Sequence, residues 1–335
     1  MAMKALTKAT IYEVAQLAGV SIATVSRALR DSDLVTAQTR ERVRAAARQL
    51  HFTPSRPARS LAEGRHAANG IVFPDLVGPY YAEVVLGYEA AAAGFGSSVL
   101  ILATRGRGDA EAAVRELAGR VDGLTVMGQT VGDDVIRSLA ATGLPIVLLA
   151  RDPVPGVDTV RARNARTAEA LAAHLLDHGH RRITFLGDPA GSPDVAGRYA
   201  GLKARIPGLH AVPLTDFDLP AGERAAHAIL RGDPPDAVVC ANDEVALGVL
   251  LAAGQAGLRV PEDLAVTGWD DLLAARFAGL TTVRQPMREL GATAARWLNR
   301  RITADHQPTA ARRRILPTQL VVRRSCGLHP PEGHR

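Results

Sequence analysis

From Ala68 onward, short apolar segments alternate with longer amphipathic ones, and this alternation limits the fold more than any other feature of the 335-residue chain. We predict strands within residues 70–74, 97–104, 122–128, 145–151, 182–188, 235–243 and 264–271, and helices at 81–96, 109–119, 133–142, 165–178, 244–256 and 288–301. Short apolar strands that alternate with helices are typical of parallel sheets covered on both faces. The expected fold class is therefore α/β, with room for two subdomains and a cleft between them.

Polar residues directly follow several of these predicted strands. In open parallel sheets, ligands bind beyond the carboxyl ends of the strands. The candidates at such ends are Asp75, Arg151, Asn242–Asp243 and Asp270–Asp271.

The stretch Thr10–Leu29 predicts two short helices joined by a tight turn. Thr10 and Glu13 have the Thr-x-x-Glu spacing of a capping box, and Gly19 ends the first helix. Ser21 caps the second helix, which leaves Arg27 on its outer face. This pattern favours a helix-turn-helix whose second helix enters a major groove; an ordinary helical hairpin is the alternative. Residues 37–50 predict a third helix that packs on the first two.

The positive charge of the chain is concentrated at its N-terminal end. The net charge is +6, and the first 65 residues hold eleven Lys or Arg and five Asp or Glu, so the remainder is neutral. A basic unit on a neutral body is expected of a protein that binds nucleic acid. No long apolar run predicts a membrane span, and residues 1–10 have no apolar signal core, so we expect a cytoplasmic protein. The two cysteines, far apart in sequence, are expected to be reduced thiols.

Several blocks in a fixed order resemble the LacI/GalR family of bacterial transcriptional regulators. They are IYEVAQLAGVSIATVSRAL, VTAQTRERV, ARSL, GHRRITFLGD, ANDEVALGVLLAAGQAGLRVPEDLAVTGWDD, LTTVRQP and PTQLVVRRS. The resemblance implies a three-helix helix-turn-helix headpiece, a hinge, and a two-subdomain core like the periplasmic sugar-binding proteins. The implied domain bounds are 1–53 for the headpiece, 54–66 for the hinge, 67–326 for the effector-binding and dimerisation core, and 327–335 for a tail. Within the core, the N-subdomain is expected at about 67–163 and 286–317, and the C-subdomain at about 164–285 and 318–326.

The resemblance also implies DNA-contacting residues. Ile22, Ala23 and Arg27 match base-contacting positions, and Arg is well suited to a bidentate contact with guanine. The expected phosphate contacts are Thr10, Ser21, Thr24 and Thr39. In the hinge, Leu61 matches a leucine that enters the minor groove and kinks the duplex, with Ala58 and Arg59 as its neighbours; an exposed linker leucine is the alternative. Pro57 departs from the family pattern; with Ser55 as the cap it is expected in the first turn of a hinge helix, where its missing N–H costs little.

The residues that the resemblance implies for effector binding lie in the core. They are Tyr80 and Tyr81 for stacking, Arg198 for gripping hydroxyls or a carboxylate, Phe217 for stacking, Asn242 and Asp270 for hydrogen bonds, and Gln285 at a crossing between subdomains. Asp75 and Arg151 are two further candidates, and relatives often carry Asp at the Arg151 position or one residue later. Plain core packing for the tyrosines, a helix cap for Asn242 and a turn for Asp270 are the alternatives.

We therefore predict a repressor that binds a near-palindromic operator as a homodimer and responds to a small-molecule effector, a sugar or related metabolite. A nucleobase effector and a solute receptor without a DNA role are the alternatives. No Gly-x-Gly-x-x-Gly, P-loop or Gly-x-Ser-x-Gly motif is present, so we expect no enzyme and no cofactor. His174, His178 and His180 match an ordinary helix-to-strand turn of the family, and no metal site is expected there.

Overall fold

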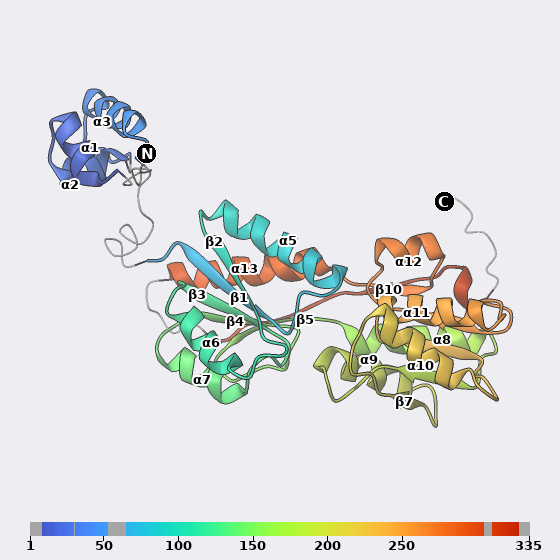
Figure 1. Ribbon diagram of the computed structural model, residues 1–335. Coiled ribbons are helices and arrows are strands. Elements are labelled where there is room, and N and C mark those ends of the chain that lie inside the picture. Colours follow the sequence, from blue (N-terminus) through green and yellow to red (C-terminus); the bar gives the residue numbers. More distant parts are fainter. Residues whose placement is uncertain (1–8, 30, 53–64, 305–309, 328–335) are drawn as a thin grey trace, which may run out of the picture. The chain divides into compact units, whose positions relative to one another are not determined.

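The computed structural model describes residues 9–29, 31–52, 65–304 and 310–327. The chain forms two compact units, Met1–His66 and Ala67–Arg335, which are shown in Figure 1. Among the described residues, no helix is both long enough and apolar enough to cross a membrane.

The N-terminal unit contains the three predicted helices, α1 (Ile11–Ala18), α2 (Ile22–Leu29) and α3 (Ala37–Gln49). Their inward faces form one small core, whose fully buried members include Val14, Val25, Ala28 and Val43. The chain turns between α1 and α2 at Gly19, whose φ of 63° is easily reached by glycine. The helix-turn-helix prediction is confirmed.

One of the two subdomains of the larger unit is built on a six-stranded parallel sheet of order β11-β5-β4-β3-β1-β2. Its strands are β1 (Ala68–Phe73), β2 (Ser98–Ala103), β3 (Gly123–Met127), β4 (Ile146–Leu149), β5 (Asp158–Ala162) and β11 (Arg313–Leu316). Helices α5 (Pro79–Gly94) and α13 (Met287–Thr303) cover one face, and α6 (Ala110–Ala118) and α7 (Asp133–Ala141) cover the other (Figure 1). We call this half the N-subdomain.

The second half, the C-subdomain, has a four-stranded parallel sheet of order β7-β6-β8-β9. Its strands are β6 (Ile183–Leu186), β7 (His210–Val212), β8 (Ala237–Cys240) and β9 (Ala265–Thr267). Its helices are α8 (Asn164–Asp177), α9 (Pro193–Lys203), α10 (Leu219–Ile229), α11 (Asp243–Gln255) and the short α12 (Leu273–Ala278). The pairs α8–α9 and α10–α11 contribute to two separate apolar cores, one on each side of this sheet.

The chain passes between the two subdomains at three places. The first passage joins β5 to α8, the second joins β10 (Thr282–Arg284) to α13, and the third joins β11 to β12 (Gln319–Val321). Strands β10 and β12 pair in antiparallel fashion, so two of the passages lie side by side. The chain then ends its described part in a short 3-10 helix at Arg324–Cys326.

All of the predicted helices and strands are present, with bounds that differ by a few residues, whereas strands β5, β7, β10, β11 and β12 were not predicted. The predicted α/β fold class with parallel sheets is confirmed. Helices α9, α10 and α12 were not predicted, and α12 has only six residues. Helix α9 buries the polar residues Asp194 and Arg198, which interrupts its apolar pattern.

Candidate functional site

The predicted phosphate-contacting residues of the headpiece lie at the starts of its three helices. Thr10 caps α1 through the predicted capping box, with its backbone N–H donating to the Glu13 carboxylate at 2.7 Å. Ser21 accepts a hydrogen bond from the backbone N–H of Thr24 at 3.2 Å at the start of α2. Thr39 lies in the first turn of α3, where its own backbone N–H donates to the Thr36 cap at 3.3 Å. Helix N-termini present free N–H groups and partial positive charge, which suit phosphate.

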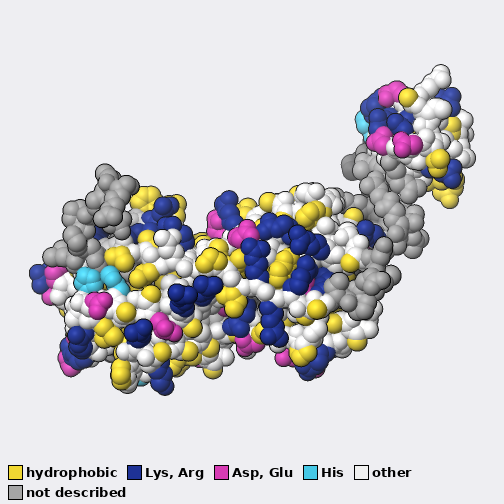
Figure 2. Space-filling view, turned by 180° about the vertical axis from the view of Figure 1, so that it is seen from behind, with side chains coloured by type: hydrophobic (Ala, Val, Ile, Leu, Met, Phe, Trp, Pro, Cys, Tyr) yellow, Lys and Arg dark blue, Asp and Glu magenta, His cyan; other side chains and the backbone are white. Residues whose placement is uncertain are grey.

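The outer face of α2 carries the predicted base-contacting residues. Ile22, Ala23 and Arg27 are all exposed, and Arg27 has no ion pair among the described residues. Arginines of α3 differ in this respect, because Arg44 pairs with Asp31 and Arg48 pairs with Glu41. Figure 2 shows acidic and basic side chains lying together on the headpiece. The Arg27 guanidinium is thus free for a ligand, whereas part of the charge on α3 is neutralised.

The hinge predictions fall on residues that lie outside the described part of the chain. Ala58, Arg59 and Leu61 belong to this group, as does Pro57. Their roles stay predictions.

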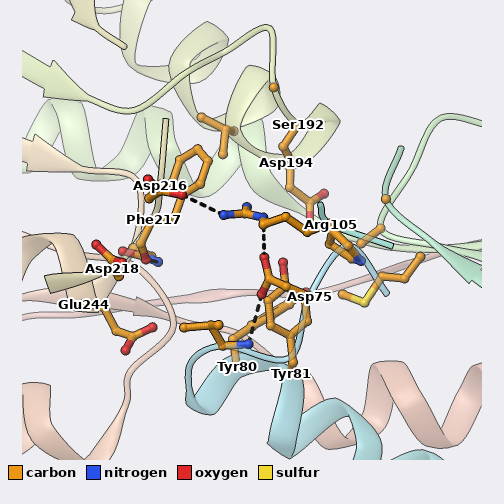
Figure 3. Close-up of a pocket in the computed structure, with 18 of the residues that line it drawn as sticks. Asp75, Tyr80, Tyr81, Arg105, Ser192, Asp194, Asp216, Phe217, Asp218 and Glu244 are labelled. Carbon is orange, nitrogen blue, oxygen red and sulfur yellow. Dashed lines mark hydrogen bonds and ion pairs between the residues drawn. The ribbon is translucent and has the colours of Figure 1, made fainter. Parts of the chain in front are cut away.

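A cavity of about 330 Å³ lies between the two subdomains, where the carboxyl ends of strands from both sheets meet (Figure 3). Its lining combines aromatic and apolar side chains with polar groups that face the cavity, and small-molecule sites use polar groups of this kind to orient their ligands. The lining residues are Pro74, Asp75, Val77, Tyr80, Tyr81, Arg105, Met127, Gly128, Gln129, Ala150, Gly191, Ser192, Asp194, Val195, Arg198, Asp216, Phe217, Asp218, Asn242, Glu244 and Asp270.

Seven of the nine predicted effector-binding residues line this cavity. They are Asp75, Tyr80, Tyr81, Arg198, Phe217, Asn242 and Asp270. Asn242 also caps α11, since its side-chain oxygen accepts from the N–H of Val245 at 2.9 Å. The helix-cap alternative for Asn242 and a place in the cavity are therefore compatible.

The structure does not place Arg151 or Gln285 in the lining. Arg151 follows β4 as predicted, but it is buried and donates to the Val131 carbonyl oxygen at 3.0 Å and to the Asp133 carboxylate at 2.5 Å. The nearby start of α7 thus holds this guanidinium. Gln285 donates to Asp270 Oδ1 at 2.6 Å, so it positions a lining residue without lining the cavity itself.

Arg198 is the most constrained side chain in the site. It is buried on α9, donates to Asn164 Oδ1 at 3.2 Å and to the Ala241 carbonyl oxygen at 2.5 Å, and lies over the Trp269 ring at 4.9 Å from the centroid. Asn164 in turn donates to Asp194 at 2.8 Å. This network fixes the orientation of the guanidinium before any ligand arrives, which lowers the entropy that binding must lose.

Three buried carboxyl groups near the cavity have raised pKa values. Burial is the main cause of the raised pKa of Asp270, and the nearby Arg198 charge opposes it. Burial likewise raises the pKa of Asp194, again against the Arg198 charge. Behind the lining, burial and the Asp270 charge raise the pKa of Asp243, which accepts hydrogen bonds from Leu272 and Thr282. The positive charge of Arg198 therefore opposes the rise in pKa of two buried carboxyl groups, Asp194 and Asp270.

Arg105 links the two subdomains across the cavity. It follows β2 in the N-subdomain, and its guanidinium lies 2.8 Å from the carboxylate of Asp75 and 2.8 Å from that of Asp216 in the C-subdomain (Figure 3). Sequence reasoning missed Arg105, Asp194, Asp216, Asp218 and Glu244. Arg105 comes two residues after β2, so the tendency of ligands to bind beyond the carboxyl ends of strands could have identified it. The other four residues are within four positions of predicted site residues.

No group of three or more His, Cys, Asp or Glu side chains in the described residues is arranged to hold a metal ion. His174 Nε2 lies 3.2 Å from Cys326 Sγ, and His180 Nε2 lies 2.9 Å from the Cys326 carbonyl oxygen, which makes these histidines partners of the C-terminal segment.

Comparison with known proteins decides the family. Residues 10–55 match the family described as bacterial regulatory proteins, lacI family, and residues 172–326 match the periplasmic binding protein-like domain. The HTH-type transcriptional repressor CytR of Escherichia coli K12 is 32% identical over 98% of this chain and 99% of its own length. The chain belongs to the lacI family of bacterial regulatory proteins.

Solved structures agree with this assignment over both units of the LacI-family chain. The Lac repressor dimer bound to operator and the anti-inducer ONPF matches with a TM-score of 0.85 and 29% identity, over 96% of this chain and 100% of that one. A complex of the transcriptional regulator CelR with cellobiose matches with a TM-score of 0.70 and 31% identity, over 95% and 100%. This LacI-family protein is therefore a DNA-binding transcriptional regulator and not an enzyme.

Proposed function

We propose that this regulator is a repressor that binds a near-palindromic operator as a homodimer and is controlled by a small-molecule effector in the cavity between the core subdomains. The observation that carries the proposal is the joint presence of a capped helix-turn-helix with a free Arg27 and a built cavity at the ends of two parallel sheets. Repressors of the same family, such as CytR, share the full length of the chain. A regulator of this kind acts in the cytoplasm, where the bacterial chromosome lies.

Within the headpiece, we assign base contacts to Arg27, Ile22 and Ala23. Arg27 supplies two donors to a guanine, and the other two offer apolar contacts such as a thymine methyl group. Phosphate contacts fall to Thr10, Ser21, Thr24 and Thr39, which fix the register on the duplex. For the hinge we keep the prediction that Leu61 enters the minor groove, flanked by Ala58 and Arg59.

Selection from random-sequence DNA tests the proposed function directly. The full-length chain without any ligand is mixed with a random DNA pool, and bound sequences are enriched over several rounds. We expect a two-fold symmetric site, because a two-fold protein matches a two-fold site. Enrichment of no sequence, or of one half-site alone, contradicts the proposal.

The homodimer is supported by apolar side chains that remain exposed on the core. Leu273 and Phe277 of α12 are 66% and 80% exposed, and Leu86 of α5 is 50% exposed. Helices α5 and α12 belong to different subdomains and lie along the same side of the larger unit (Figure 1). Exposed apolar groups of this size indicate a binding surface, and the similar Lac repressor structure is a dimer. We assign this face to a second copy of the chain.

The change Phe277→Asp is expected to raise the dimer dissociation constant by about 30-fold or more, because it places a charge in an apolar interface. Sedimentation equilibrium measures this constant. The matched control is Ile315→Asp on β11, where an apolar residue is 58% exposed, and we expect no change in the dimer there. Equal dissociation constants for both variants contradict the assignment of α12.

Effector binding is assigned to the seven lining residues Asp75, Tyr80, Tyr81, Arg198, Phe217, Asn242 and Asp270, with Gln285 in support. Arg105 and Asp216 join them, because their ion pair connects the two subdomains. A ligand that changes this connection changes the angle between the subdomains, and this change is the link to the hinges and the DNA.

A further inference from the structure

Arginines gather on the N-subdomain where the end of α13 lies near the edge strand β11. Between residues 296 and 314 the sequence has six arginines and one aspartate, although residues 66–335 as a whole carry no net charge. We call the six arginines the arginine patch: Arg296, Arg300, Arg301, Arg312, Arg313 and Arg314. Figure 2 shows a large group of Lys and Arg side chains on the larger unit.

A buried carboxylate orients two members of the arginine patch. The side chain of Asp158 is fully buried, and it accepts hydrogen bonds from Arg301 at 2.6 Å and from Arg312 at 2.6 Å. The Arg312 guanidinium also lies over the ring of Trp297, at 4.6 Å from the centroid. One carboxylate thus holds two guanidinium groups, which keep a net positive charge and are fixed before any partner arrives.

The remaining charge of the patch is only partly neutralised. Arg296 lies 2.9 Å from the carboxylate of Glu289, and Arg314 lies 3.8 Å from the same group. Arg300 and Arg313 are exposed, and neither has an ion pair within the described part of the chain. Among the described residues, two carboxylates therefore pair with a patch of six guanidinium groups.

The patch lies toward the edge of the sheet at which the chain arrives from the headpiece. Strand β1 is the first strand after the headpiece, and Gly123 of β3 pairs with Asn69 near its start. A Cβ atom placed on Gly123 falls 2.8 Å from Leu298, so the last turns of α13 pack beside the start of β1. Strand β11 runs in the same direction as β1, so its first residues lie toward this edge as well.

We propose that the arginine patch binds the phosphate backbone of the DNA duplex that the headpiece holds. The inference rests on DNA binding by this regulator and adds a second binding surface, on the core. Guanidinium groups suit phosphate, because their planar fork donates two hydrogen bonds to its oxygens. Only residues 50–67 separate α3 from β1, so a duplex bound by the headpiece is present at a high effective concentration for the core.

The double variant Arg300→Ala/Arg313→Ala tests the proposal in the full-length protein. Binding to the selected operator duplex is titrated over a range of salt concentrations. Each lost phosphate contact lowers the slope of log affinity against log salt by about 0.9, so we expect a decrease of roughly 2–4 for the dimer. At low salt the affinity should fall about tenfold or more. Selection from random DNA should return the parental site, because phosphate contacts carry no sequence information.

Two further variants complete the test. The matched control is Arg205→Ala/Arg231→Ala, which removes two exposed arginines of the C-subdomain and should keep the parental slope. Arg300→Lys/Arg313→Lys retains the charge and should restore most of the slope.

Three outcomes overturn the proposal. The first is a parental slope in Arg300→Ala/Arg313→Ala, which assigns the patch to an acidic partner protein instead. The second is an equal decrease in both alanine variants, and the third is a lysine variant that behaves like its alanine counterpart. If selection returns a two-fold operator in any of these cases, the inference about the patch fails and the proposed function stands.

Discussion

The variant Arg27→Ala is expected to lose operator affinity by roughly 1–3 kcal/mol per half-site, and to relax the preference at one base pair in each half. Arg27 is exposed on α2 and has no ion pair among the described residues, so its truncation removes the proposed DNA contact without breaking an ion pair within the headpiece. Because a dimer uses the side chain twice, the loss for the full operator is about twice the loss for one half. A mobility-shift titration on the selected operator measures it.

The control for Arg27→Ala is Arg42→Ala. Arg42 is an exposed arginine of α3, so the two variants lose the same formal charge. A cation that acts on phosphates alone weakens binding about equally across sequences and lowers its salt dependence. Selection with Arg27→Ala should return a changed site, whereas selection with Arg42→Ala should return the parental one. The same altered preference in both variants, or in neither, removes Arg27 from the base-contacting set.

The variant Gly87→Ala is expected to destabilise the core by about 1–3 kcal/mol or more, because α5 and α13 pack too closely for a methyl group. A Cβ atom on Gly87 falls 2.0 Å from the Arg288 carbonyl oxygen, which belongs to the backbone of α13 and cannot rotate away. Gly291 has the reciprocal position, at 2.0 Å from the Val84 carbonyl oxygen. Calorimetry should show Tm lowered by roughly 2–10 °C.

Gly94→Ala on the same helix is the matched control. No atom lies within 4 Å of a Cβ placed on Gly94, so the added methyl group meets no obstacle. Alanine favours helix over glycine by roughly 0.5–1 kcal/mol, and we expect a small gain in stability. If both variants lower Tm equally, close helix contact is not the reason that position 87 carries glycine.

Periodicity in the sequence was sufficient for most of the fold. Helices such as α8 and α11 show an apolar face, and the predicted strands contain short apolar runs, so their alternation indicated parallel sheets. Strands β5, β7, β10, β11 and β12 were missed, because their short sequences mix polar and apolar residues. Helix α9 was missed because its inner face carries Asp194 and Arg198, whose burial depends on partners such as Asn164 that come from a distant segment. Local pattern carries no information about such partners.

The type of a residue and its position after a strand predicted several residues of the candidate site. The sequence did not show which of these side chains are bound by other residues of the protein. Asp75 and Asp270 follow strands and line the cavity, as the strand-end rule predicts. Arg151 also follows a strand, but it is held by Asp133 at the start of α7 and does not line the cavity. The bridge from Arg105 to Asp216 joins loops 111 residues apart, and it depends on how the two subdomains face one another.

The order of segments in the chain has a consequence for synthesis. The headpiece is complete by residue 52, whereas the N-subdomain lacks its edge strand β11 and its covering helix α13 until residue 316 has been made. At about 5–20 residues per second, the ribosome needs roughly 10–50 s for this interval. During that time a nascent chain presents a folded DNA-binding headpiece without a finished core. We expect such chains to bind DNA only weakly and without response to effector, so that the last-made segments decide when a new molecule becomes a working regulator.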